Sequence, residues 1–168
     1  MIFRLTERDL QTKYGTFREI LYYDGQAESI ALVMGSVEAE ENLICRVHSA
    51  CVSGHVFNSV ECKCQAEMEA AQSEIQVAGK GVIIYLEQEG KGNGHLALMA
   101  SIPYKKAGMK QSEAYQKVGF EADARIFRPA AEILQDLKVK SIVLLTNNAG
   151  KAEDLRRWSI DVSRTKEI

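Results

Sequence analysis

The chain has 168 residues, of which 46% are hydrophobic and 26% charged, with a net charge of −2. This length suits one globular domain with a hydrophobic core, and the small net charge excludes a general attraction to nucleic acid or anionic membranes, though not a local basic pocket. No apolar run approaches the ~18 residues of a membrane span, and the charged first ten residues do not resemble a secretory leader. We therefore expect a cytoplasmic protein with reduced thiols.

The first half of the chain predicts three strands followed by a helix. The strands cover residues 16–23, 28–35 and 43–49. From Gln65 the apolar residues adopt a helical spacing, and Gly79 is expected to end this helix. The residues that carry this spacing are Met68, Ala71, Ile75 and Ala78.

The second half alternates strands with helices. Residues 81–87 and 141–146 are continuous apolar runs, which are typical of strands covered on both faces. Further elements are a helix starting at His95, one capped by Ser112, one beginning with Pro129, one through Leu155 and Trp158, and a short strand at 159–163. We predict a single α/β domain over residues 1–168, with a mixed sheet flanked by helices. Loops 89–94 and 146–151 should lie at the carboxyl ends of strands, where such sheets bind ligands.

Three cysteines form the pattern C-x10-C-x-C: Cys51, Cys62 and Cys64. Three thiolates are one short of a closed structural zinc site, and an open fourth position is the arrangement that activates water. The pattern therefore indicates a catalytic zinc. The alternative is that these cysteines are buried small hydrophobes or free thiols. Cys45, in an apolar run, is expected in the core.

Several polar residues could bind phosphate, although each has an ordinary alternative. Strand alternation places Arg46 and His48 on one face, just before Cys51, and a guanidinium can bind two phosphate oxygens. Thr146 and Lys151 could hold phosphate at a helix N-terminus, or could cap and solvate that helix. The loop EGKGNG matches neither the P-loop nor the dinucleotide fingerprint. Asp123 and Arg125 by themselves suggest only an ion pair.

The motifs RVHSAC, C-K-C, YLEQEGKGNG, GFEADAR and LLTNNAGK occur in this order and resemble those of GTP cyclohydrolase II, a zinc enzyme of riboflavin biosynthesis. The resemblance runs from about residue 10 to about residue 165. It implies zinc-assisted attack of water at C8 of the guanine imidazole ring, loss of formate and separate release of pyrophosphate. It also implies a homodimer and a Mg²⁺ ion that bridges the nucleotide phosphates.

The resemblance also assigns roles to individual residues. Zinc would be bound by Cys51, Cys62 and Cys64. Arg125 corresponds to the arginine proposed to attack the α-phosphorus, with Asp123 as the acid–base residue beside it. The remaining substrate contacts would be Arg46, His48 and Ser49 at the phosphates, Glu89, Gly90 and Lys91 in the nucleotide loop, Thr146 and Lys151 completing the pocket, and the positions of Glu67 and Gln111.

The chain departs from the family at some of these positions. Ile102 occupies the place of a catalytic tyrosine, and Tyr104 is a candidate stand-in although it is turned by about 200° around the helix. The other departures are Lys91 for an arginine, Gln65 for a glycine, Glu67 for a glutamine and Gln111 for a threonine.

Two hypotheses follow from these departures. Ring opening could stop at a formamidopyrimidine product, or the substrate could be another purine nucleotide or a pyrimidine-related compound. Three other classes are considered: a zinc nucleobase deaminase, a non-catalytic nucleotide sensor and a structural zinc module. The first requires a P-C-x-x-C motif, which this sequence does not contain.

Overall fold

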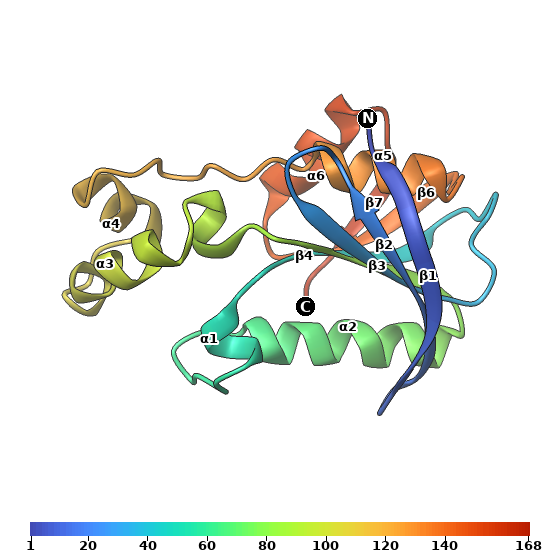
Figure 1. Cartoon of the computed structure of the whole chain (residues 1–168), viewed down its shortest axis with the longest axis horizontal. Coiled ribbons are helices and arrows are strands. Elements are labelled where there is room, and N and C mark those ends of the chain that lie inside the picture. The colour runs from blue at the N-terminus through green and yellow to red at the C-terminus, as the bar shows by residue number, and fades with distance from the viewer.

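A computed structural model describes all 168 residues and builds them around one seven-stranded mixed sheet (Figure 1). The strands are β1 (Phe3–Thr12), β2 (Gly15–Tyr23), β3 (Glu28–Met34), β4 (Leu43–Ser49), β5 (Gly81–Leu86), β6 (Ser141–Leu145) and β7 (Asp161–Lys166). Their order is β1-β2-β3-β5-β4-β6-β7, antiparallel from β1 to β5 and parallel from β5 to β7. The expected α/β class with a mixed sheet is confirmed.

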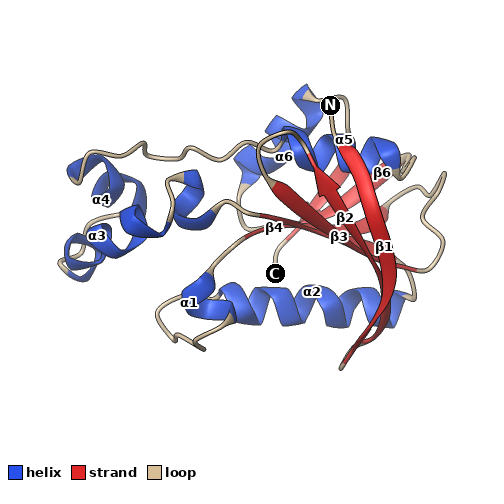
Figure 2. Cartoon of the chain, in the orientation of Figure 1, coloured by secondary structure: helices blue, strands red, loops and turns tan.

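Helices cover both faces of the sheet. They are α1 (Val52–His55), α2 (Cys64–Ala78), α3 (His95–Lys106), α4 (Gln111–Lys117), α5 (Arg128–Asp136) and α6 (Ala149–Arg157). Helix α2 packs on one face, whereas α5 and α6 pack on the other (Figures 1 and 2). Helices α3 and α4 pack against each other beside the sheet. A loop with a 3₁₀ turn, η1 (Glu89–Gly92), leads from β5 to this pair, and an extended segment leads back from α4 to α5.

The core has two parts because the central strands are buried on both faces. Ile84 of β5 points into the larger cluster with α5 and α6, whereas its neighbour Ile83 points into the smaller cluster with α2. Ile133 of α5 and Ile75 of α2 fill the two sides. Each such fully buried side chain stabilises the fold by about 1.5–3 kcal/mol, which explains why β5 and β6 are continuous apolar runs.

Strand β1 and helix α1 were not predicted from the sequence. Most side chains of β1 are exposed, so no apolar alternation marks this edge strand, and α1 is too short for helical periodicity.

Three predicted boundaries were wrong. Helix α4 starts at Gln111 with Lys110 as its N-cap, so Ser112 is not the cap; its hydroxyl instead accepts a hydrogen bond from Lys91 Nζ at 2.8 Å. Helix α5 starts at Arg128, which makes Pro129 its second residue; the first-turn N–H groups are free, so proline fits there too. The last strand is Asp161–Lys166 rather than 159–163, because the chain turns at Ser159 with a φ of 64°.

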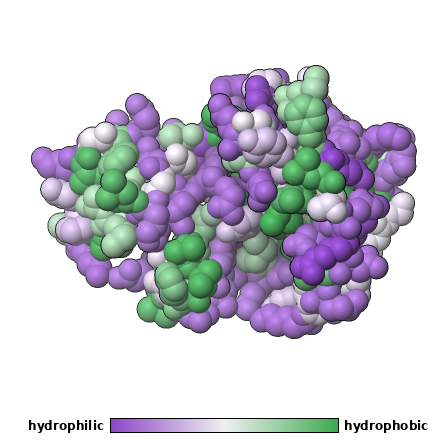
Figure 3. Space-filling model, in the orientation of Figure 1, coloured by the Kyte–Doolittle hydropathy of each residue, from purple (hydrophilic) through white to green (hydrophobic).

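The surface is mainly polar, with separate apolar patches over the positions of α1, of α3, and of the N-terminus with β1 (Figure 3). The exposed apolar residues near α1 and α3 are Val52, Val56, Phe57, Val60, Leu96 and Met99. None of the helices has both the length and the hydropathy that crossing a bilayer requires.

Candidate active site at the carboxyl ends of three strands

The adjacent parallel strands β5, β4 and β6 end at the same edge of the sheet. Strand β4 ends at Ser49 and leads to Cys51, β5 leads to Glu89, and β6 leads to Thr146. The loops 89–94 and 146–151 therefore lie at the edge where the sequence predicted a ligand site. This topology brings together segments that are about a hundred residues apart in the chain.

The three cysteines of the C-x10-C-x-C pattern converge, with their sulfur atoms within 4.8 Å of one another. The Sγ atoms of Cys51 and Cys62 are 3.7 Å apart, close to the ~3.8 Å expected for two thiolates on a tetrahedral zinc with bonds of about 2.3 Å. Gly54 allows this approach, because a Cβ there would lie 3.0 Å from the Cys62 sulfur and 3.4 Å from that of Cys51. The cluster fits a zinc ion with three protein ligands.

The fourth cysteine, Cys45, lies apart from the cluster of three. Burial raises the pKa of Cys64 and of Cys51, so a bound cation would have to displace thiol protons. Cys45 is completely buried, and its burial raises its pKa to about 12. It lies in the core cluster of β4, as predicted, and not with the other three.

A cleft of about 220 Å³ opens beside the cysteines. It is lined by Ser49, Ala50, Cys51, Cys62, Cys64, Gln88, Glu89, Gly90, Lys91, Leu98, Lys105, Gln111, Tyr115 and Arg125. The cleft thus combines the three cysteines with both acidic and basic side chains. The hydroxyl of Ser49 is buried and makes no hydrogen bond within the protein.

Side chains of the loop after β5 connect the cysteine region to α4. Glu89 Oε2 accepts a hydrogen bond from the backbone N–H of Val52 at 2.7 Å, which ties this loop to the start of α1. Lys91 donates to Ser112, and burial lowers the pKa of Lys91 below its usual value. Gln111 Nε2 donates to Ser101 Oγ at 3.1 Å.

Asp123 and Arg125 lie on an extended segment, residues 121–126, which we call the strap. Arg125 Nε and Nη2 donate to the two carboxylate oxygens of Asp123 at 2.8 and 2.5 Å. Burial opposes ionisation of Asp123, but its hydrogen bonds from Arg125 hold the pKa of the carboxyl below its usual value. The two residues therefore form the expected ion pair, and Arg125 also lines the cleft.

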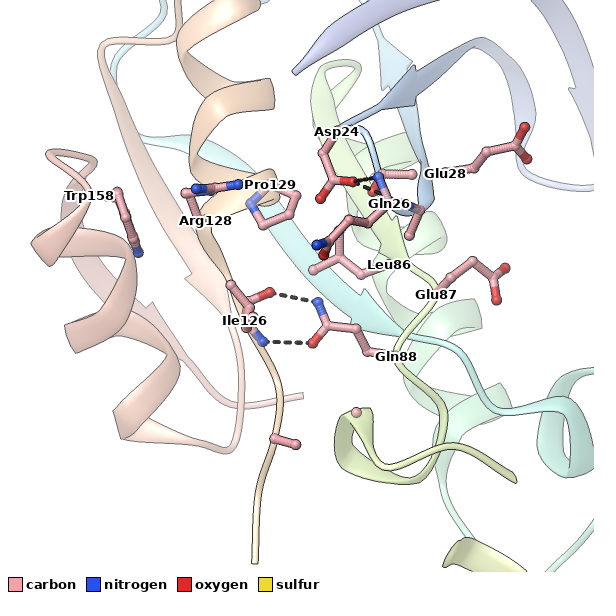
Figure 4. A pocket seen from close by; sticks show the side chains of 14 residues that line it. Asp24, Gln26, Glu28, Leu86, Glu87, Gln88, Ile126, Arg128, Pro129 and Trp158 are labelled. Carbon is pink, nitrogen blue, oxygen red and sulfur yellow. Dashed lines mark hydrogen bonds between the residues drawn. The ribbon is translucent and has the colours of Figure 1, made fainter. Parts of the chain in front are cut away.

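Two amide side chains that the sequence analysis did not single out hold the strap. The Gln88 amide donates to Ile126 O at 2.6 Å and accepts from Ile126 N at 2.9 Å (Figure 4). The Asn93 amide does the same with Glu121, at 2.9 and 3.2 Å. Behind the strap lies a second cavity of about 350 Å³, between Asp24, Arg128 and Trp158 (Figure 4). No local pattern marks these amides, because the strap residues that they bind, Ile126 and Glu121, lie 38 and 28 residues away in the chain.

Five of the predicted substrate contacts do not line the cleft: Arg46, His48, Glu67, Thr146 and Lys151. Arg46 is 5% exposed; its Nη1 donates to Leu145 O at 3.0 Å and its Nη2 to Glu67 Oε2 at 2.5 Å. Lys151 Nζ donates to Val47 O at 2.7 Å, and burial, reinforced by the charge of Arg46, lowers its pKa to about 7. These cations already have protein partners, so binding a phosphate would require them to exchange those partners.

His48 is also buried in this layer. Burial, reinforced by the charge of Arg46, lowers the pKa of His48 to about 3, so the ring is neutral. Arg46 Nε donates to its Nδ1 at 3.4 Å, and its Nε2 lies 3.0 Å from Nε2 of His55. Because Nδ1 accepts, the proton of His48 is on Nε2 and points to His55.

The candidate stand-in Tyr104 does not line the cleft, and neither does Ile102. The tyrosine that does is Tyr115 of α4, which is 1% exposed and whose hydroxyl makes no hydrogen bond to the protein. A helix was expected at this position, but the direction in which its tyrosine points depends on how α4 packs against α3.

The GTP cyclohydrolase II family model matches residues 4–167. The riboflavin biosynthesis protein RibBA of Bacillus mycoides is 39% identical over 165 residues, which are 97% of this chain and 42% of that protein. RibBA of Bacillus cytotoxicus is 39% identical over 158 residues, 93% of this chain and 40% of that protein. This chain therefore spans less than half the length of these relatives.

A crystal structure of RibBX from A. baumannii, described as a two-domain 3,4-dihydroxy-2-butanone 4-phosphate synthase, has the same fold. It aligns with a TM-score of 0.51 and 23% identity, covering 88% of this chain and 34% of that one. The family match extends over nearly the whole sequence and includes the cysteine cluster, the strap and the loop after β5. Together with the identity to RibBA, it shows that the chain belongs to the GTP cyclohydrolase II family.

Proposed function

We propose that the chain catalyses the zinc-dependent hydrolytic opening of the imidazole ring of GTP or a related nucleotide. One observation carries this proposal: three thiols within 4.8 Å of one another line the same cleft as Glu89 and Arg125. A zinc ion held by Cys51, Cys62 and Cys64 would supply a Lewis acid that lowers the pKa of water. The relatives named for riboflavin biosynthesis support a role in that pathway.

The side chains of the cleft suit the parts of a nucleotide. Glu89 offers a carboxylate acceptor for the N–H groups of a guanine, and Gly90 leaves room beside it. Arg125, Lys91 and Ser49 offer donors for phosphate oxygens. Arg125 remains the proposed attacking group at the α-phosphorus, with Asp123 beside it as the acid–base residue, and Mg²⁺ is proposed to accompany the phosphates.

The buried polar residues that do not line the cleft are proposed to reach the substrate only after a rearrangement. Arg46, His48, Thr146 and Lys151 would contact phosphate only if the substrate drew Arg46 away from Glu67. Glu67 and Gln111 differ from the family residues, and both are held by protein partners, Arg46 and Ser101. The contacts of Glu67 with Arg46 and of Gln111 with Ser101 support the alternative proposal that the substrate differs from GTP.

The experiment is to incubate zinc-loaded protein with GTP and Mg²⁺ and to identify the products by mass spectrometry, with Cys62→Ser as the control. Formate and pyrophosphate would indicate a complete GTP cyclohydrolase II reaction. A product equal to GTP plus water would indicate ring opening that stops at the formamide, with or without loss of pyrophosphate. Equal product from Cys62→Ser would contradict a zinc-dependent reaction.

The second candidate is a non-catalytic nucleotide sensor, which is favoured by Ile102 at the position of the family tyrosine. It predicts tight GTP binding without any product, and no turnover of other purine nucleotides or pyrimidine compounds in a panel. Turnover of one of these compounds in place of GTP would instead indicate a changed substrate.

We further propose that the protein is a cytoplasmic homodimer. The exposed apolar side chains near α1 and α3, including Phe57 and Leu96, support association with a second copy, since patches of this kind often mark interaction sites. Light scattering after size-exclusion chromatography tests this proposal, and a monomer at every concentration would contradict it.

A further inference from the structure

Tyr115 presents a free hydroxyl group to the cleft that contains the three cysteines. The residue is 1% exposed and lines the cleft, and its hydroxyl lies 3.6 Å from the place where a Cβ on Gly90 would stand. The ring is buried, whereas the hydroxyl makes no hydrogen bond to the protein and opens onto the cleft. Because a tyrosine hydroxyl can both donate and accept a hydrogen bond, it is available to a ligand in the cleft.

The surroundings of Tyr115 keep this phenol protonated and in place. Burial, together with the charge of Glu89, raises the pKa of Tyr115 to about 12, so that near neutral pH the hydroxyl can donate a proton. The ring belongs to the buried face of α4, which packs against α3. The packing fixes the ring, and only the O–H bond can rotate toward a ligand in the cleft.

We propose that Tyr115 is the proton-donating residue of this cleft during ring opening. The inference rests on the proposed function, and it places the phenol on α4 rather than on α3. The two α3 positions considered from the sequence do not compete for the role, because Ile102 lines a separate hollow with Glu61 and Lys105, and Tyr104 lines no part of the cleft.

The proton balance of the reaction suits a neutral phenol. Ring opening consumes one water: the carbon gains the oxygen as a carbonyl, its bond to one ring nitrogen breaks, and each of the two ring nitrogens gains one proton. Tyr115 would give its proton to the departing nitrogen and would recover one from the attacking water, while the second water proton goes to the nitrogen that keeps the formyl carbon. The step consumes the substrate and one water, and it requires no oxidant, reductant or further reactant.

The test compares wild-type protein, Tyr115→Phe, Tyr104→Phe and, as a matched control, Tyr23→Phe, whose ring lies at the exposed end of β2. Phenylalanine keeps the packing of the ring and removes only the hydroxyl. We expect kcat for ring opening to fall at least about 100-fold in Tyr115→Phe, in the range of acid–base catalysis. Its zinc content and its affinity for GTP should stay within about twofold of wild type and its melting temperature should be unchanged, because a purely structural role would change these properties instead.

A second measurement reports on Tyr115 without turnover. With 3-fluorotyrosine incorporated at position 115, the ¹⁹F signal should shift when GTP is added to zinc-loaded protein. An active wild type with an equally active Tyr115→Phe, or a ¹⁹F signal that GTP leaves unchanged, would overturn this inference alone. Loss of activity in Tyr104→Phe with full activity in Tyr115→Phe would also overturn it. A wild type that opens no ring would remove the proposed function and this inference together.

Discussion

The hydrogen bonds from Asn93 to the strap can be removed to test whether they hold Arg125 in the cleft. The Nδ2 group of Asn93 donates to Glu121 O at 2.9 Å and to Gly90 O at 3.2 Å, and its Oδ1 accepts from Glu121 N at 3.2 Å. Asn93 does not line the cleft, so a substitution there can affect Arg125 only through the backbone. The perturbation is Asn93→Ala, which removes all three hydrogen bonds and adds no charge.

The expected magnitude follows from these three contacts. A hydrogen bond contributes about 0.5–1.5 kcal/mol net. The two exposed bonds to Glu121 contribute about 0.5 kcal/mol each and the part-buried bond to Gly90 O about 1 kcal/mol, so the sum is about 2 kcal/mol. The strap is an extended segment outside the core, so the loss should appear as local opening rather than global unfolding. About 2 kcal/mol corresponds to roughly 30-fold more frequent opening.

Hydrogen exchange measured by mass spectrometry on peptides that cover residues 121–126 would detect this change. Exchange of the strap should accelerate roughly 30-fold while β5 remains protected. The control is Gln135→Ala, which removes one hydrogen bond, from the Gln135 side-chain amide to Trp158 O, and no contact with the strap. Unchanged strap exchange in Asn93→Ala, or equal acceleration in the control, would refute the reasoning. Ring-opening activity should fall by at least about tenfold, because small displacements of positioned groups reduce rates strongly.

Three further predictions concern single residues near the site. Gly92→Ala should also loosen the strap and lower activity, because a Cβ would lie 2.7 Å from Ala124 C at a φ of +81°; wild-type strap exchange in this variant would contradict the prediction. Glu67→Gln should lower the free energy of unfolding by about 1–2 kcal/mol, because buried Arg46 loses its charged partner but keeps a hydrogen-bond acceptor. Because Arg46 is then held less strongly, titration calorimetry should show tighter GTP binding than in wild type. Burial lowers the pKa of Lys151 from its usual 10.5 to about 7, so between these pH values the unfolded chain binds more protons than the folded one, and the free energy of unfolding rises with pH. Lys151→Met should lack this contribution when stability is measured by denaturant titration. A difference in stability between wild type and variant that does not change with pH would contradict the prediction.

The sequence by itself predicted much of the fold and the cluster of three cysteines. Continuous apolar runs at 81–87 and 141–146 predicted β5 and β6, because a strand that is covered on both faces needs apolar residues at every position. The cysteine spacing predicted the thiol cluster, because Cys62 and Cys64 are separated by one residue and need only Cys51 to join them. The order of five motifs identified the family, which the comparisons confirm.

Only the tertiary structure decided how these parts meet. Apolar periodicity reports whether a segment buries a face of its own, so the exposed edge strand β1 left no signal. Periodicity also cannot say which side chains from distant segments share a space: Arg46 and Lys151 lie behind the cleft because β4 runs between β5 and β6. Tyr115 faces the cleft, whereas Tyr104 does not, because the packing of α4 against α3 sets these directions, and that packing depends on contacts that no local pattern contains.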